Sequence, residues 1–169
     1  MLLRMAFLAA VACFVSACGR SLPPYEKPIA RANFQHVRTT AYTHSESDHL
    51  VHGCQTCVGT PLRSGAVNSA AADWSRWPAG TVFRLLSTGQ NYRVEDYGWA
   101  LSGRNTIDLY MANQREMNSW GARPETIEVL KWGDPQESLQ FLRRHQDYRH
   151  IKRMVLELEG RQKEAASLR

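Results

Sequence analysis

Asp108 is the residue of this chain whose surroundings best suit acid–base chemistry. It interrupts Ile107-Asp108-Leu109-Tyr110, a run that otherwise has the composition of a core strand. A carboxylate there must be paired, or desolvation raises its pKa, and a raised pKa suits a general acid. In a strand, Asp108 shares a face with Thr106 and Tyr110, while its immediate neighbours point to the other face. Asp108 can therefore face a groove; the alternative is a structural carboxylate that accepts hydrogen bonds from turn amides.

A second group of reactive side chains precedes the middle of the chain. Cys54 and Cys57 form a Cys-x-x-Cys pair, with His49 and His52 upstream. Thiolates and imidazoles are zinc ligands, but the spacing lacks a standard second ligand pair. Outside the cytoplasm a disulfide that closes this loop is favoured over zinc, and two idle thiols are a further alternative. A thioredoxin-type redox role is not expected, because Cys54 does not begin a helix after a strand.

The segment that positions these residues, 36–132, is patterned as short strands separated by turns. Alternating, β-branched or aromatic runs of strand length occupy 37–42, 81–86, 92–94, 106–111 and 126–132. Five or six short strands in about a hundred residues predict a small closed barrel, because closure removes strand edges that aggregate. Residues 112–120 are predicted to form a short helix that Gly121 ends.

The C-terminal segment, 133–169, has a helical pattern and a tail-like end. Asp134 is a typical N-cap and Pro135 a typical first helical residue. One apolar stripe is formed by Phe141, Tyr148, Ile151, Val155 and Leu158. We expect one amphipathic helix that packs on the barrel or projects from it with a basic face. The stripe is too short and too mixed to predict a coiled coil, so no oligomeric state is predicted.

The first 17 residues have the pattern of an export signal. Arg4 gives a positive start, the apolar run 5–15 is too short to span a bilayer, and small residues follow. The sequence Val15-Ser16-Ala17-Cys18 resembles a bacterial lipobox, which implies that Cys18 is acylated and anchors the chain in a membrane. An ordinary signal peptide with a chance Cys, or a short hydrophobic anchor, are the alternatives. Residues 18–35 are expected to be a lipidated, extended tether, because three prolines lie within them.

Composition excludes some classes of protein and leaves others open. The chain has 169 residues, of which 43% are hydrophobic and 22% charged. This balance excludes disorder along the whole length, and the length fits one domain with tails. A formal charge of +5 attracts anionic partners but does not distinguish nucleic acid, anionic lipid and cell-wall polymer. Four cysteines are too few for a disulfide scaffold.

Six separate motifs, in order and spacing, together resemble the 3D domain, a family named for three aspartates. They are Thr40-Ala41-Tyr42, Ala72-Asp73, Pro78-Ala79-Gly80-Thr81, Glu95-Asp96-Tyr97-Gly98-Trp99-Ala100-Leu101-Ser102-Gly103, Ile107-Asp108-Leu109-Tyr110 and Trp120-Gly121-Ala122-Arg123. This family is similar to the catalytic barrel of membrane-bound lytic murein transglycosylase A and of the stationary-phase survival muralytic enzymes. The resemblance covers residues 36–132 and implies a mainly β fold, a six-stranded double-psi β-barrel followed here by the C-terminal amphipathic helix.

The same resemblance implies a lytic murein transglycosylase, which cleaves the β-1,4 bond between N-acetylmuramic acid and N-acetylglucosamine without water. Asp108 takes the place of the catalytic acid, and its conjugate base then accepts the proton of the muramyl C6 hydroxyl as a 1,6-anhydro ring closes. Asp96 would orient Asp108 or keep it protonated, and Asp73 would be structural or position the substrate. The implied partner is the glycan strand of peptidoglycan, with no nucleic acid and no cofactor.

Two positions depart from the family pattern. Trp99 stands where the family has a second glycine, and Ser102 stands in place of a lysine. Trp99 adds bulk to a groove wall, although an aromatic ring also stacks on sugars; with Tyr42 and Tyr110 it is expected to bind substrate or be structural. Two alternatives remain: a non-catalytic 3D-domain lipoprotein that binds or scaffolds peptidoglycan, and a glycan hydrolase on the same barrel. By resemblance to enterobacterial sorting, glycine at position 19 implies the periplasmic side of the outer membrane.

Overall fold

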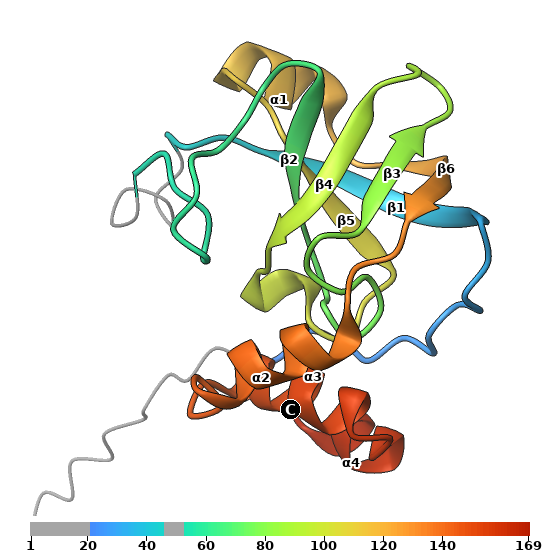
Figure 1. The fold of residues 1–169 in the computed structure, drawn as a ribbon, viewed down its shortest axis with the longest axis vertical. Coiled ribbons are helices and arrows are strands. Elements are labelled where there is room, and N and C mark those ends of the chain that lie inside the picture. The colour runs from blue at the N-terminus through green and yellow to red at the C-terminus, as the bar shows by residue number, and fades with distance from the viewer. Residues whose placement is uncertain (1–20, 46–52) are drawn as a thin grey trace, which may run out of the picture.

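A closed barrel of six strands forms the centre of the structure, a computed structural model that describes residues 21–45 and 53–169 (Figure 1). The strands are β1 (Phe34–Tyr42), β2 (Val67–Ala72), β3 (Val82–Leu85), β4 (Asn91–Asp96), β5 (Thr106–Tyr110) and β6 (Arg123–Lys131). Their order around the barrel is β1-β5-β2-β4-β3-β6. The pairs β1/β5 and β2/β4 are parallel and the other pairs antiparallel. The predicted mainly β fold and closed barrel are confirmed.

The strand that the sequence pattern missed is β2. Its sequence, VNSAAA, is poor in the β-branched and aromatic residues that favour strands. In the structure its three alanines are buried, and β2 pairs with β4 on one side and β5 on the other. Pairing on both sides, which local propensity does not reveal, therefore makes this segment a strand. The other five strands overlap the predicted ones, although β1 begins at Phe34, two residues before the predicted start of the domain.

The barrel interior is filled by alternate side chains of the strands. Ile107 and Leu109 of β5 are both 0% exposed and belong to this core. Asp108 lies between them and is half-buried on the other face of the strand. The alternation predicted for this run is therefore what the structure has. The short helix α1 (Gln114–Trp120) also lies where predicted, with Gly121 as its C-cap.

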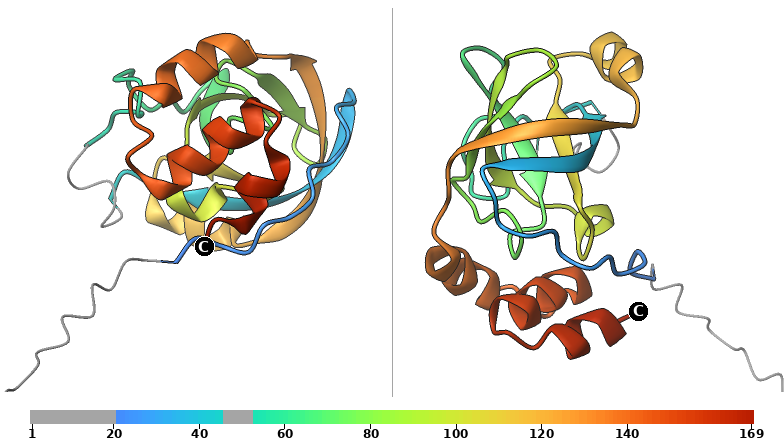
Figure 2. Two further views of the ribbon diagram at one scale, coloured as in Figure 1. Left: turned by 90° about the horizontal axis from the view of Figure 1, so that it is seen from below. Right: turned by 90° about the vertical axis from the view of Figure 1, so that its right-hand side faces the viewer.

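The C-terminal segment does not form one helix. It folds into α2 (Pro135–Arg143), α3 (Arg149–Leu158) and α4 (Gln162–Ser167), which gather at the end of the barrel opposite α1 (Figures 1 and 2). Asp134 caps α2 as predicted, and its Oδ1 accepts hydrogen bonds from the amides of Gln136 and Glu137. A single helix through both α2 and α3 would be about 35 Å long, too long for one barrel end to cover its apolar face. The fold-back allows both helices to bury theirs, and it leaves Tyr148 exposed.

The expected tether is extended, but the described part of it packs against the domain. Leu22 is 7% exposed, and Arg153 donates a hydrogen bond of 2.8 Å to the carbonyl of Pro23. Arg76 donates one of 2.5 Å to the carbonyl of Glu26. The chain is therefore fastened to the barrel and helices from Leu22 onward. Among the described residues, no helix has both the length and the apolar character needed to cross a membrane.

Buried charges join α3 to the barrel. Nε of Arg76 lies 3.6 Å from Oε1 of Glu157, and both side chains are less than a tenth exposed. Asp73, fully buried in the barrel, acts on the same carboxyl group. Burial and then repulsion from Asp73 raise the pKa of Glu157 to about 7. The folded state therefore favours protonated Glu157.

Glu157→Gln is expected to flatten the pH dependence of folding stability. Because the folded pKa lies above the ordinary 4.5, the folded state binds more protons, and this group's contribution to the free energy of unfolding falls as pH rises from 4.5 to about 7. The loss is about 2–3 kcal/mol in the native chain and is absent from the variant. Urea denaturation at pH 4.5, 6 and 7.5 measures it. Glu116→Gln, a change at an exposed carboxylate of α1, should keep the native slope, and equal slopes for Glu157→Gln and the native chain would contradict the assignment.

Candidate active site

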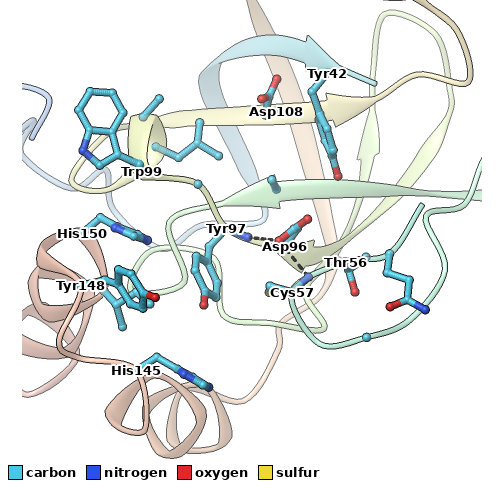
Figure 3. Close-up of a pocket in the computed structure, with 17 residues that line it drawn as sticks. Tyr42, Thr56, Cys57, Asp96, Tyr97, Trp99, Asp108, His145, Tyr148 and His150 are labelled. Atoms are coloured by element: carbon cyan, nitrogen blue, oxygen red, sulfur yellow. Dashed lines mark hydrogen bonds between the residues drawn. The ribbon is translucent and has the colours of Figure 1, made fainter. Parts of the chain in front are cut away.

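A pocket of about 820 Å³ opens between the barrel and the turn that joins α2 to α3 (Figure 3). Its barrel wall comes from the ends of β1 and β4, from Ala71 of β2 and Asp108 in the middle of β5, from the loop at 55–59 and from the 3-10 helix η1 (Trp99–Leu101). The predicted site residues that line it are Tyr42, Cys57, Asp96, Trp99 and Asp108. The fold thus brings two of the three aspartates to one cavity.

The two aspartates flank a single small residue. Ala71 of β2 is in register with Asp96 of β4 on one side and with Asp108 of β5 on the other. Residues in register across a sheet point to the same face, so both carboxylates face the pocket that Ala71 also lines. Their Cα atoms are two strand spacings apart, about 10 Å. The methyl group of Ala71 leaves the space between them open to a ligand.

Asp108 is held by a neighbouring strand. Thr40 of β1 is in register with it, and the Thr40 hydroxyl donates a hydrogen bond of 2.6 Å to its Oδ1. On the inner face of the strand, its neighbours are anchored in the core, as described above. The side chain is therefore positioned on a rigid element at the pocket wall, the arrangement that acid–base chemistry requires.

A bulge in β4 turns Asp96 toward the same pocket. The register of β2 against β4 shifts between Ala70 and Ala71, so Glu95 is the extra residue. Glu95 instead pairs with Arg63 and accepts a hydrogen bond of 3.0 Å from Ser69. Oδ1 of Asp96 accepts hydrogen bonds from the amides of Cys57 and Tyr97, at 3.2 and 2.9 Å. These two amides fix the position of this oxygen at the pocket wall.

The pKa of Tyr42 is affected by both carboxylates. Burial raises its pKa well above the ordinary value, and the charges of Asp96 and then Asp108 raise it further. The phenol is therefore protonated at neutral pH and can donate a hydrogen bond at the pocket wall. Figure 3 shows its ring beside Asp108.

Asp73 and Tyr110 lie apart from this pocket. Asp73 is 0% exposed, and its oxygens accept hydrogen bonds from the Ser75 amide, the Ser75 hydroxyl and the Gly103 amide. These contacts are those of a structural carboxylate that ties two loops together. Tyr110 is buried against Tyr42, with ring centroids 5.6 Å apart, and its hydroxyl lies 2.9 Å from Nδ1 of His44. Neither residue lines the cavity that holds Asp108.

Cys57 lines the pocket, and the cysteine pair forms no metal centre among the described residues. Cys54 is exposed and Cys57 half-buried, and both are free thiols in the structure. Burial and the nearby Asp96 raise the pKa of the Cys57 thiol, which keeps it protonated at neutral pH. Across residues 21–45 and 53–169, no three His, Cys, Asp or Glu residues are grouped as metal ligands. His49 and His52 lie outside the described residues, so the disulfide and the zinc site both stay predictions.

The sequence pattern gave no role to the opposite wall of the pocket. His145 and Tyr148, from the turn between α2 and α3, line it together with His150 and Ile151 at the start of α3. The hydroxyl of Ser102, buried beside η1, donates a hydrogen bond of 2.9 Å to the carbonyl of His150. This bond joins the barrel wall to the helical wall. Only the aromatic and imidazole character of residues 145–150 hinted at a site here.

No protein-family model and no curated protein matches this chain. The resemblance to the 3D domain therefore rests on the motifs quoted above, and membership of that family stays a prediction. The geometry of the pocket is an observation independent of that resemblance.

Thr40→Val is expected to destabilise the chain by about 1–2 kcal/mol at pH 7, because it removes a hydroxyl donor from a carboxylate while keeping the side-chain shape. Urea denaturation measures the change. Thr126→Val is the matched control: it removes a hydroxyl that lies 2.9 Å from Nδ1 of His36 at an exposed site, and should cost less than about 0.5 kcal/mol. If both variants lose the same free energy of unfolding, the hydrogen bond to Asp108 contributes no more to stability than the exposed one.

Proposed function

We propose that this chain is a lipid-anchored lytic transglycosylase of peptidoglycan, with Asp108 as general acid and base. One observation carries the proposal: Asp108 and Asp96 face one pocket from strands on either side of Ala71. A pocket of about 820 Å³ with aromatic walls is large enough to hold part of a glycan strand on each side of the reacting bond. The resemblance to the 3D domain supplies the substrate class.

The proposed reaction needs one carboxyl group that gives and then takes a proton. Asp108 protonates the glycosidic oxygen as the bond from that oxygen to C1 of N-acetylmuramic acid breaks. The C6 hydroxyl of the same sugar then attacks C1, and its proton returns to Asp108 as the 1,6-anhydro ring closes. No water is consumed, so no second carboxylate is required to activate it.

Asp96 has a supporting role in this proposal. Because two backbone amides fix its Oδ1, its charge is held at a constant place in the pocket. A fixed negative charge favours the protonated form of a neighbouring acid and stabilises positive charge that develops at C1. The phenol of Tyr42, whose pKa is raised by the charges of Asp96 and Asp108, donates a hydrogen bond to the substrate or to Asp108.

The barrel topology and the N-terminal pattern support two finer parts of the proposal. The parallel pairs β1/β5 and β2/β4, brought together by the pairing of β5 with β2, are compatible with a double-psi barrel. For the lipoprotein, acylated Cys18 would lie four residues before the packed Leu22, so the domain would sit close to the bilayer surface, on the periplasmic side of the outer membrane. Cys18 itself lies outside the described residues.

Asp108→Asn is expected to lower the release of anhydro-muropeptides from purified sacculi by at least about 100-fold, the usual contribution of a general acid. Mass spectrometry of products from the chain starting at Gly19 gives the measurement. Asp147→Asn changes an exposed aspartate outside the pocket and should keep full activity. Thermal unfolding of both variants checks that they fold.

Each other product pattern would replace the proposal with a definite alternative. Products with reducing ends, lost in Asp108→Asn, would make the chain a glycan hydrolase. Binding to sacculi without release of any muropeptide would make it a non-catalytic binding or scaffolding protein. Unchanged release by Asp108→Asn would remove Asp108 from the reaction.

A further inference from the structure

The wall of the pocket across from the two carboxylates carries an exposed aromatic ring (Figure 3). Tyr148 lines the pocket and is 63% exposed, the most exposed large hydrophobic side chain among the described residues. Trp99 of η1 lines the same cavity from the barrel side. Ligand pockets are lined predominantly by hydrophobic and aromatic side chains, so an exposed ring at the rim of this cavity offers a surface that a ligand can cover.

The rings behind Tyr148 fix its place. Its centroid is 5.9 Å from that of His150, which is 6.0 Å from that of Tyr97. Tyr97 in turn packs edge-on against Trp74, with centroids 5.0 Å apart, and Trp74 is 1% exposed in the core. A continuous row of rings therefore runs from the core to the pocket rim. A ligand that binds to this row loses little free energy to the ordering of side chains, because the rings are already packed against one another.

Two side-chain hydrogen bonds connect α3, which follows this turn directly, to the end of η1. The hydroxyl of Ser102 donates to the carbonyl of His150, and Arg153 of α3 donates a hydrogen bond of 3.0 Å to the carbonyl of Ser102. Ser102 follows η1 directly and is 0% exposed. The segment that carries Trp99 and the turn that carries Tyr148 are thus parts of one rigid wall.

The charges of the pocket limit the kind of ligand that this wall can bind. The described residues that line it include Asp96 and Asp108 but no lysine or arginine. Burial lowers the pKa of His150, so its imidazole is neutral at pH 7 and can hydrogen-bond a hydroxyl or an amide. Anionic ligands such as phosphates or peptide carboxylates would meet two carboxylates and no fixed cation. An uncharged ring with polar edges fits this wall.

We propose that Tyr148, with His150 and Trp99, forms a binding subsite for a neutral N-acetylated hexose of a β-1,4-linked glycan. One face of the sugar ring stacks on Tyr148, and its polar edge lies toward the imidazole of His150. The subsite deepens the proposed function and rests on it for the glycan: it holds a sugar of the same strand across the pocket from Asp108. It gives the C-terminal helices a direct part in substrate recognition.

The test is a calorimetric titration with a β-1,4-linked tetrasaccharide of N-acetylglucosamine, using the chain from Gly19 with Asp108→Asn to prevent turnover. Tyr148→Ala in this background is expected to weaken binding about 5- to 10-fold, the usual effect of one aromatic stacking contact. Tyr148→Phe, which keeps the ring, should retain affinity within about twofold. Phe34→Ala is the matched control, because Phe34 is 60% exposed at the start of β1 and outside the pocket. It should bind like the parent.

The outcomes separate this subsite from the proposed reaction. Equal affinities of Tyr148→Ala and the parent, or no saturable binding by the parent, would overturn the subsite. Tighter, Tyr148-dependent binding of a muramyl stem peptide would also overturn it, since the ligand would then not be the sugar. If tetrasaccharide binding depends on Tyr148 but the chain with native Asp108 releases no anhydro-muropeptides from sacculi, the proposed reaction would be overturned and the subsite would stand.

Discussion

The arrangement of the pocket depends on the pairing of β2 with two strands at once. Because β4 and β5 both bond to β2, residues that are 12 positions apart in the sequence come to lie on either side of Ala71. The bulge at Glu95 is part of this constraint: without the extra residue, Asp96 would point into the core and its neighbour would face the pocket. Small side chains on β2 are therefore a requirement of the site, because any larger residue at position 71 would fill the space between the carboxylates.

The buried charges at the end of the barrel are the second constraint. Arg153 is 1% exposed, yet it reaches the carbonyls of Pro23 and Ser102, which belong to the N-terminal segment and to the loop after η1. A buried guanidinium needs several acceptors, and here they come from segments far apart in the chain. One residue of α3 thus fixes the N-terminal segment, the loop after η1 and the helices together. These hydrogen bonds of Arg153 hold the helical wall of the pocket in place.

The sequence predicted the features that repeat locally and missed those that need distant partners. The alternation around Asp108 predicted which side of β5 it occupies, and the Asp134-Pro135 pair predicted the start of α2. The strand β2 was missed because its alanines lack β-propensity, and only the neighbours on both sides make it a strand. The single C-terminal helix was wrong because the chain turns back at residues 144–148, which divides the apolar stripe between α2 and α3. The wall formed by Tyr148 and His150 follows from that turn, so no local pattern could place it.

The serine at position 102, where the family that the sequence resembles has a lysine, has a physical explanation in this fold. Position 102 is fully buried, its hydroxyl bonds to the carbonyl of His150, and its own carbonyl accepts a hydrogen bond from Arg153. A lysine there would bury a second cation beside Arg153 and would remove the hydroxyl that bonds to the carbonyl of His150, at a cost of several kcal/mol. A serine at this position therefore suits the packing of α3 against the barrel. Where α3 contacts the barrel, this chain has a hydrogen bond from Ser102 to the carbonyl of His150, and Trp99 supplies an aromatic surface to the pocket beside it.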